Sequence, residues 1–173
     1  MSQTWHSPGA WRKDMIGRCL PEEIDSIYSV INDGAKAYRG FIPADCYHEP
    51  YMSFDELSRE MEQMSFFGWR ENKELVGVIG FQPVEDVTLV RHAYVMGSWR
   101  RRGIGSGLLN EVKACTRTRR LLVGTWVDAW WAIRFYEQHG FSLVTDKDKL
   151  LRAYWRIPAR QVEVSVVLGL SLP

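Results

Sequence analysis

A basic, glycine-rich segment is the part of this sequence whose residue types most clearly point to chemistry. A helical run, residues 108–113, follows it directly. The segment itself has the sequence Arg100-Arg101-Arg102-Gly103-Ile104-Gly105-Ser106-Gly107. The first N–H groups of a helix have no acceptor within the helix, and glycines let a phosphate approach the backbone closely. Since arginines add charge-assisted contacts, we expect a phosphorylated ligand to bind at this segment.

Two widespread phosphate-binding patterns fit this segment poorly. A P-loop requires Gly-Lys followed by Ser or Thr, which the sequence does not contain. A dinucleotide-binding turn requires GxGxxG, whereas Gly103, Gly105 and Gly107 give GxGxG and position 108 is leucine. Asp128 does follow about 20 residues later, as a dinucleotide fold would require. The three arginines before the first glycine belong to neither pattern and argue against both.

A third pattern matches the segment and its surroundings. The spacing Arg100-x-x-Gly103-x-Gly105 resembles the acyl-CoA pyrophosphate loop, Q/R-x-x-G-x-G/A, of the GNAT N-acetyltransferase superfamily. Val95 lies eight residues before Gly103, where that family has a valine at a strand end. Residues 132–141, AIRFYEQHGF, resemble the family's second signature, A-I-x-F-Y-E-x-x-G-F. Two motifs in the expected order and separation make the resemblance specific over residues 75–141.

The resemblance implies a cosubstrate and a reaction. Backbone amides in the segment would hold the pyrophosphate of acetyl-CoA, and the backbone near Val95 would pair with its pantetheine arm. The thioester would lie between two diverging strands, residues 84–95 and 121–127. A primary amine of a small molecule or peptide would then attack the thioester directly. The implied cofactor-binding residues are Val95, Arg100, Arg101, Arg102, Gly103, Ile104, Gly105 and Ser106.

Two other functions remain as alternatives at this point. A GNAT-like domain could bind acyl-CoA as a sensor or interaction module without turnover. One departure from the family pattern favours that alternative, because Ala129 stands where the family often has an asparagine that contacts the cofactor arm. A second departure, Gly97 in place of a frequent proline, loosens the turn without removing the phosphate site. A dinucleotide-dependent oxidoreductase would need a longer chain with a substrate domain.

Two side chains are candidates for the proton transfers of an acetyl transfer. By the resemblance, Tyr136 stands where a phenol donates a proton to the leaving thiolate. His92 titrates near neutrality when unperturbed, so it is a candidate general base. Strand alternation puts His92 and Tyr94 on one face and Arg91 and Ala93 on the other, unless a bulge intervenes. Glu85, Asp86 or a chain of water molecules are alternative bases.

Two further segments are candidates for binding the acceptor. The loop between the first two helices, Phe41–Met52, lies where this superfamily binds its acceptor, and it offers Tyr47, His48 and Glu49. Long loops in compact domains are often functional. A second stretch, residues 154–161, begins with Tyr154 and Trp155 and is expected to shape the far wall of the pocket. Packing is the competing interpretation for each of these side chains.

The elements that must position these residues follow from hydrophobic periodicity and capping signals. Strands are expected at residues 15–20, 66–70, 75–81, 84–95, 121–127, 141–144 and 162–168, and helices at 21–35, 53–61, 108–118, 130–139 and 145–155. Neighbouring strands joined by hairpins favour a mixed, largely antiparallel sheet. The fold class is therefore α+β (mixed α/β), with a GNAT-like, mostly antiparallel twisted sheet of about six to seven strands flanked by helices.

Composition sets the broad class. The chain has 173 residues, 46% hydrophobic and 25% charged, with a net charge of +1, so neither a nucleic acid nor a membrane is indicated as a partner. We expect a flexible tail at residues 1–10 and one domain at 11–173. Cys19, Cys46 and Cys115 are widely spaced, which predicts reduced thiols in a cytoplasmic protein without a metal site. The last strand, 162–168, could pair with a second copy at an exposed edge, giving a homodimer.

Overall fold

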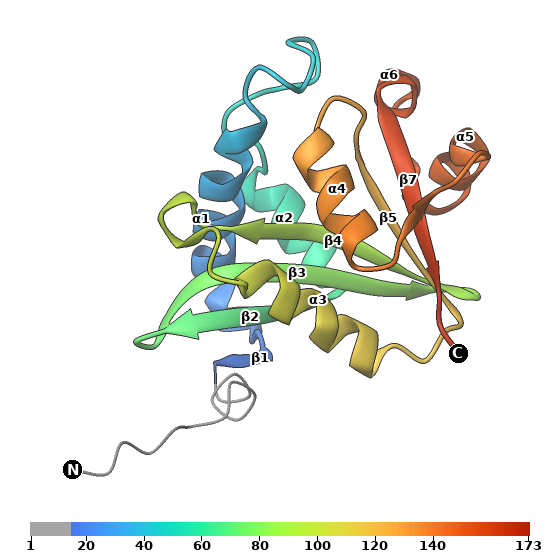
Figure 1. Cartoon of the computed structure of the whole chain (residues 1–173). Coiled ribbons are helices and arrows are strands. Elements are labelled where there is room, and N and C mark those ends of the chain that lie inside the picture. The colour runs from blue at the N-terminus through green and yellow to red at the C-terminus, as the bar shows by residue number, and fades with distance from the viewer. Residues whose placement is uncertain (1–14) are drawn as a thin grey trace.

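A seven-stranded sheet, covered by helices on both faces, organises the chain (Figure 1). The computed structural model describes residues 15–173, so the expected tail at residues 1–10 lies outside the described residues. The strands are β1 (Ile16–Arg18), β2 (Ser65–Glu71), β3 (Glu74–Val84), β4 (Val87–Val95), β5 (Arg120–Trp126), β6 (Ser142–Leu143) and β7 (Ser165–Ser171). Their order in the sheet is β1-β2-β3-β4-β5-β7-β6, and only β4 and β5 pair in parallel. The predicted fold class is confirmed.

The helices occur where periodicity and capping signals predicted most of them. They are α1 (Ile24–Ala35), α2 (Phe54–Met61), α3 (Ile104–Cys115), α4 (Trp130–Gln138), α5 (Lys147–Leu150), a π-helical turn (Leu151–Trp155) and α6 (Ala159–Glu163). Ser53 caps the start of α2, because its hydroxyl accepts the Glu56 N–H at 3.2 Å. The strands β2 and β3 form the predicted hairpin.

Two hydrophobic layers hold the helices on the sheet. One face packs under α3 and α4, with Leu108, Leu109 and Tyr136 against Ile79 and Val123. The other face packs under α1 and α2 at one end. The π-helical turn and α6 cover its other end. Figure 1 shows α3 and α4 lying in front of the central strands, with α1 and α2 behind them.

The last strand differs from its prediction in both bounds and environment. The run 162–168 was expected to be the strand, but Val162 belongs to α6, which begins after Pro158, and β7 starts at Ser165. The strand was also expected to form an exposed edge, and this was wrong, because β7 lies between β5 and β6. Most of the alternating residues belong to α6 and the turn after it, whereas Val167 and Leu168 of β7 are consecutive and both buried.

A tight turn also shifts one boundary in the middle of the chain. The expected strand 84–95 is shorter, since Val84 ends β3 and a turn at Glu85 and Asp86 precedes β4. Glu85 has a positive φ of 52° in this turn. No helix within residues 15–173 is long and apolar enough to cross a membrane.

Candidate functional site

The site lies where the two parallel strands of the sheet separate. The strands β4 and β5 pair only from Val87 to Val90 and from Arg120 to Val123, and the ladder then ends. The remaining residues of β4 therefore turn backbone polar groups toward open space, where such groups require partners. Cavities of about 620 Å³ and about 430 Å³ occupy the region. The two cavities have four lining residues in common, Tyr38, Ala93, Tyr94 and Tyr136.

The start of α3 forms one wall of the larger cavity. Gly103 precedes the helix with φ +79°, a left-handed conformation that glycine adopts without strain. The first intrahelical bond runs from the Gly107 N–H to the Gly103 carbonyl at 3.0 Å, and no side chain caps the helix. The N–H groups of Ile104, Gly105 and Ser106 consequently have no acceptor within the helix. All three residues line the larger cavity, so the expected phosphate site opens into it.

The three arginines have different surroundings. Arg100 Nη2 donates to the Gly34 carbonyl at 2.8 Å, which ties the turn to the end of α1. Arg102 stacks over the Trp99 ring, with its guanidinium carbon 4.5 Å from the ring centroid. Arg100 and Arg101 line the larger cavity, whereas Arg102 does not. Two of the three predicted arginines are thus placed beside the helix start, and the third packs on an aromatic ring.

The two departures from the family pattern have structural counterparts. The Gly97 N–H, which a proline would lack, donates to Asp33 Oδ2 at 2.8 Å, so a hydrogen bond to α1 holds this turn. Ala129 is fully buried against Trp126 and Ala132, and its methyl group offers no hydrogen bond to a ligand. Val95 lines the larger cavity at the end of β4.

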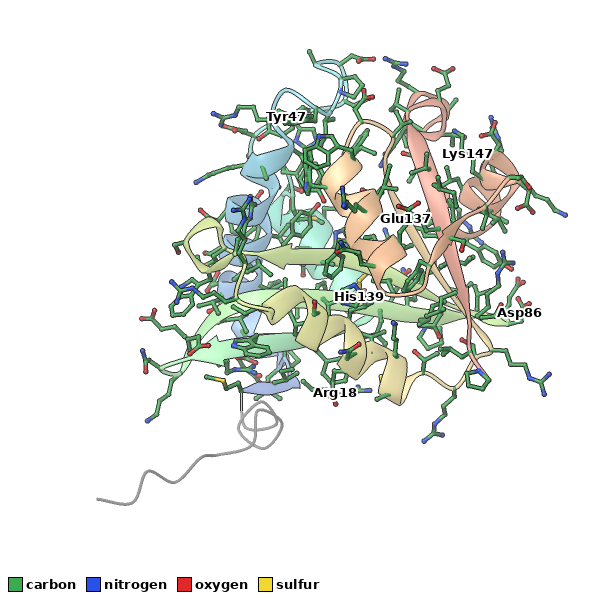
Figure 2. The ribbon with its side chains drawn as sticks, in the orientation of Figure 1. Arg18, Tyr47, Asp86, Glu137, His139 and Lys147 are labelled. Atoms are coloured by element: carbon green, nitrogen blue, oxygen red, sulfur yellow. The ribbon has the colours of Figure 1, made fainter. Side chains whose placement is uncertain are left out.

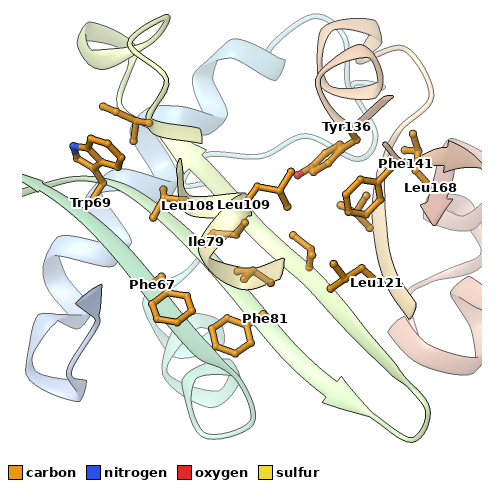
Figure 3. Packing of buried hydrophobic residues seen from close by; sticks show 14 of the residues in the cluster. Phe67, Trp69, Ile79, Phe81, Leu108, Leu109, Leu121, Tyr136, Phe141 and Leu168 are labelled. Atoms are coloured by element: carbon orange, nitrogen blue, oxygen red, sulfur yellow. The ribbon is translucent and has the colours of Figure 1, made fainter. Parts of the chain in front are cut away.

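Tyr136 stands at the junction of the two cavities. It belongs to α4 and is 6% exposed, packed between Phe135 and Phe141 with ring centroids 5.1 and 5.6 Å away. Figure 3 shows Tyr136 beside Phe141. Burial raises the pKa of its phenol well above the ordinary value. The hydroxyl therefore stays protonated across the physiological range and can donate a proton or a hydrogen bond to a group in either cavity.

A bulge in β4 aims the candidate base at the smaller cavity. Val78 pairs with Tyr94 and Gly80 pairs with Arg91. Two residues of β4, His92 and Ala93, therefore lie opposite the single residue Ile79 of β3. His92 has φ +50° in this bulge. A Cβ on Gly80 would lie 2.9 Å from the Arg91 carbonyl oxygen, so this close approach requires glycine.

Because of this bulge, the predicted alternation of faces along β4 is wrong for Arg91. Arg91 was expected opposite His92, but both side chains contact Glu60 of α2 on the same face. Arg91 Nη2 donates to Glu60 Oε1 at 3.0 Å, and His92 Nε2 contacts Glu60 Oε2. Ala93 packs on the opposite layer, under α3 and α4.

Glu60 is a functional candidate that sequence reasoning missed. Burial opposes ionisation of its carboxyl, but the hydrogen bond from His92 and the charges of His92 and Arg91 outweigh it and lower the pKa. The carboxylate therefore stays ionised beside the imidazole and can stabilise its protonated form, as an acidic partner does for a catalytic histidine. The sequence signal was the position of Glu60 four residues after Glu56 on one face of α2.

Tyrosines form a buried group between the two cavities. Tyr94 lies 6.1 Å from both Tyr38 and Tyr51, centroid to centroid, with steeply inclined rings. Burial raises the pKa of Tyr38 to about 12 and also raises the pKa of Tyr94 and Tyr51. Trp126 Nε1 donates to the Tyr51 hydroxyl at 3.3 Å. The side chains between the two cavities are thus aromatic and uncharged.

Of the four acceptor candidates, two line the smaller cavity and two lie outside it. His48 and Trp155 line the smaller cavity. Tyr47 lies outside its lining and donates to Glu49 Oε1 at 2.9 Å, in the loop at the top of Figure 2. Tyr154 also lies outside and donates to Asp86 Oδ1 at 3.2 Å.

The alternative bases, Glu85 and Asp86, lie outside both cavities. Glu85 and Asp86 occupy the turn between β3 and β4, and neither residue lines either cavity. Figure 2 places Asp86 at the end of the sheet away from α1. Within residues 15–173, no group of three or more His, Cys, Asp or Glu side chains is arranged as a metal site.

Comparison with known proteins agrees with this architecture. Residues 62–143 match the family model described as the acetyltransferase (GNAT) domain. The match extends from the end of α2 through β6 and includes both the glycine-rich turn and Tyr136. The part of the chain that carries both sequence motifs is thus similar to the GNAT acetyltransferase domain. The resemblance inferred from the two sequence motifs is confirmed.

Solved GNAT structures have the same fold at low sequence identity. The PaiA N-acetyltransferase of Thermoplasma acidophilum, solved in complex with coenzyme A, is 15% identical with a TM-score of 0.71, covering 91% of this chain and 98% of its own. A GNAT acetyltransferase of Staphylococcus aureus is 16% identical with a TM-score of 0.70 and the same coverages. The ribosomal-protein-alanine N-acetyltransferase of Brucella melitensis is 14% identical with a TM-score of 0.66, covering 91% and 99%. No curated protein matches the sequence significantly.

Proposed function

We propose that this protein transfers the acetyl group of acetyl-CoA to a primary amine. One observation supports the proposal above all others. A cavity beside a helix N-terminus and a cavity beside a histidine–glutamate pair meet at Tyr136, where β4 and β5 separate. A donor for the leaving group and an acceptor for the amine proton thus line neighbouring cavities that have Tyr136 in common.

The larger cavity fits acetyl-CoA on two counts. The free N–H groups of Ile104, Gly105 and Ser106, at the positive end of α3, suit a pyrophosphate. Arg100 and Arg101 add charge beside them. The unpaired edge of β4 beyond Val90 suits the amide groups of a pantetheine arm, which can take the place of a missing strand.

The chemistry follows from the two proton-transfer groups. The incoming ammonium gives a proton to His92, whose imidazolium Glu60 stabilises. The amine nitrogen then forms a bond to the carbonyl carbon of the thioester, and the carbon–sulfur bond breaks. The sulfur leaves with the electron pair of that bond and takes a proton from Tyr136, which regains one from the nitrogen through the solvent. The products are an acetamide and the free thiol of coenzyme A.

A non-catalytic acyl-CoA-binding module is the second candidate function. Ala129 favours it, because the methyl group offers no hydrogen bond where the family often has an asparagine. Both candidates require the larger cavity to bind acetyl-CoA, and only the enzyme requires the smaller one. Turnover therefore separates them.

A panel of amines, incubated with purified protein and acetyl-CoA, tests the proposal by the release of free thiol. The panel should contain aliphatic and aromatic amines, amino acids and peptides with free N-termini. We expect thiol release above the amine-free control for at least one class, with the acetylated product confirmed by its mass. Binding of acetyl-CoA without thiol release for any class would support the sensor instead.

A further inference from the structure

The charges that line the smaller cavity leave one carboxylate without a partner. Three carboxylates and two guanidiniums line it. Arg91 pairs with Glu60, and Arg160 is shared between Asp45 at 2.7 Å and Glu163 at 3.2 Å. Within residues 15–173, the Glu56 carboxylate has no ion pair or hydrogen bond. Among the carboxylates and guanidiniums of the lining, the unpaired negative charge is therefore that of Glu56.

The position of Glu56 directs this charge at the acceptor. Glu56 and Glu60 are four residues apart on α2, so they lie on the same face of the helix, one turn apart. Both line the smaller cavity, with Glu60 at the candidate base. Glu56 lies close enough to Tyr51 for its charge to raise the pKa of that phenol, after the larger effect of burial. A negative charge thus stands beside the aromatic wall, one helical turn from the proton-transfer pair.

The walls of the smaller cavity are suited to a flat or apolar body. Tyr51, Trp126 and Trp155 line it, and Tyr38 and Tyr94 separate it from the larger cavity. Aromatic faces attract cations as well as flat rings. A volume of about 430 Å³ is in the range of sites for small molecules.

We propose that the acceptor is a small cationic amine on an aromatic body that has no carboxylate, and that Glu56 selects it. This inference rests on the proposed function and specifies its substrate class. The ammonium is drawn in by Glu56 and the aromatic walls before it reaches His92. An α-carboxylate would meet the unpaired charge of Glu56 and would find both lining arginines already paired, so an amino acid with the same ring is a poor acceptor.

Matched pairs of acceptors test the proposal directly. Rates of thiol release with 2-phenylethylamine and tryptamine are compared with those for phenylalanine and tryptophan at saturating acetyl-CoA. We expect kcat/KM at least about 10-fold higher for each amine than for its amino acid, since opposite-charge and like-charge contacts differ by this much or more. Equal or better use of the amino acids, or turnover confined to peptides, would overturn the inference while leaving the proposed function intact.

The variant Glu56→Gln tests the residue itself. We expect it to raise KM for the amines about 5- to 10-fold with little change in kcat. The ratio of kcat/KM for each amine to that for its amino acid should fall by a similar factor. Glu62→Gln is the matched control, because Glu62 is exposed at the end of the same helix and lines neither cavity. An unchanged preference in Glu56→Gln would overturn the role of Glu56.

A binding measurement keeps the inference testable if turnover fails. Trp126 and Trp155 line the smaller cavity, so quenching of tryptophan fluorescence in the presence of coenzyme A reports occupancy. Binding of 2-phenylethylamine, which does not fluoresce in the tryptophan range, without thiol release would refute the proposed enzyme but retain the selectivity. Equal binding of amine and amino acid would overturn the selectivity in either case.

Discussion

Replacing Tyr136 by phenylalanine separates chemistry from binding and from folding. The ring is 6% exposed between Phe135 and Phe141, and phenylalanine keeps all of this packing. No hydrogen bond within residues 15–173 contributes to the pKa of this hydroxyl, so its removal should change the free energy of unfolding by less than about 1 kcal/mol. The loss of a positioned proton donor should lower kcat by about 10²- to 10⁴-fold. This corresponds to about 3–5 kcal/mol of transition-state stabilisation.

The assay follows free thiol at saturating amine and acetyl-CoA, with the affinity for acetyl-CoA measured separately by calorimetry. We expect the affinity to change by less than about 2-fold, because the phosphate site at the start of α3 is untouched. Tyr28→Phe is the control, since Tyr28 packs on Phe54 and lines neither cavity. Because burial raises the pKa of Tyr136 far above neutrality, the wild-type activity should not decline through its ionisation below pH 10. An unchanged kcat would refute the role of Tyr136 as the acid.

Three further predictions follow from the structure. Gly103→Val should weaken acetyl-CoA binding at least 10-fold in calorimetry, since a β-branched residue is strained at φ +79° beside the phosphate site; retained affinity would exclude that site. In denaturant titrations, Gly107→Ala should lower the free energy of unfolding by about 1–3 kcal/mol, because its Cβ would lie 2.6 Å from Trp69. Gly105→Ala has its nearest contact at 3.5 Å and should raise the free energy of unfolding by up to about 1 kcal/mol. A change of the same sign in both variants would contradict the packing of α3. Because the pKa of Glu60 is lowered in the folded protein, its contribution to stability is present above pH 4.5 and is lost as the pH falls below that value. Glu60→Gln should therefore flatten the pH dependence of the free energy of unfolding between pH 5 and 3. An unchanged slope would argue against the pairing of Glu60 with His92.

The sequence was sufficient to predict the elements with strong local signals. Ser53 and Glu56 define the start of α2, and the hairpin of β2 and β3 follows from two apolar runs around a short polar turn. The glycine-rich turn and the motif around Tyr136 were predictable because each is a local pattern, and the fold brings both to the larger cavity.

The parts that were missed depend on contacts between distant residues. The pairing of Glu60 with His92 joins α2 to a bulge in β4, and a bulge has no reliable signature in one sequence. The run from Val162 to Leu168 alternates as an edge strand would, but Val162 belongs to a helix and β6 pairs with β7 at Leu168 and Gly169. Alternation alone does not distinguish an edge strand from an inner one.

Calorimetric titration with acetyl-CoA, and with NAD as the competing ligand, tests the central claim most directly. The account predicts saturable binding of one acetyl-CoA per chain, no binding of NAD, and loss of the acetyl-CoA signal in Gly103→Val. The absence of heat with acetyl-CoA, together with binding of NAD, would contradict the assignment of the glycine-rich turn as an acyl-CoA site.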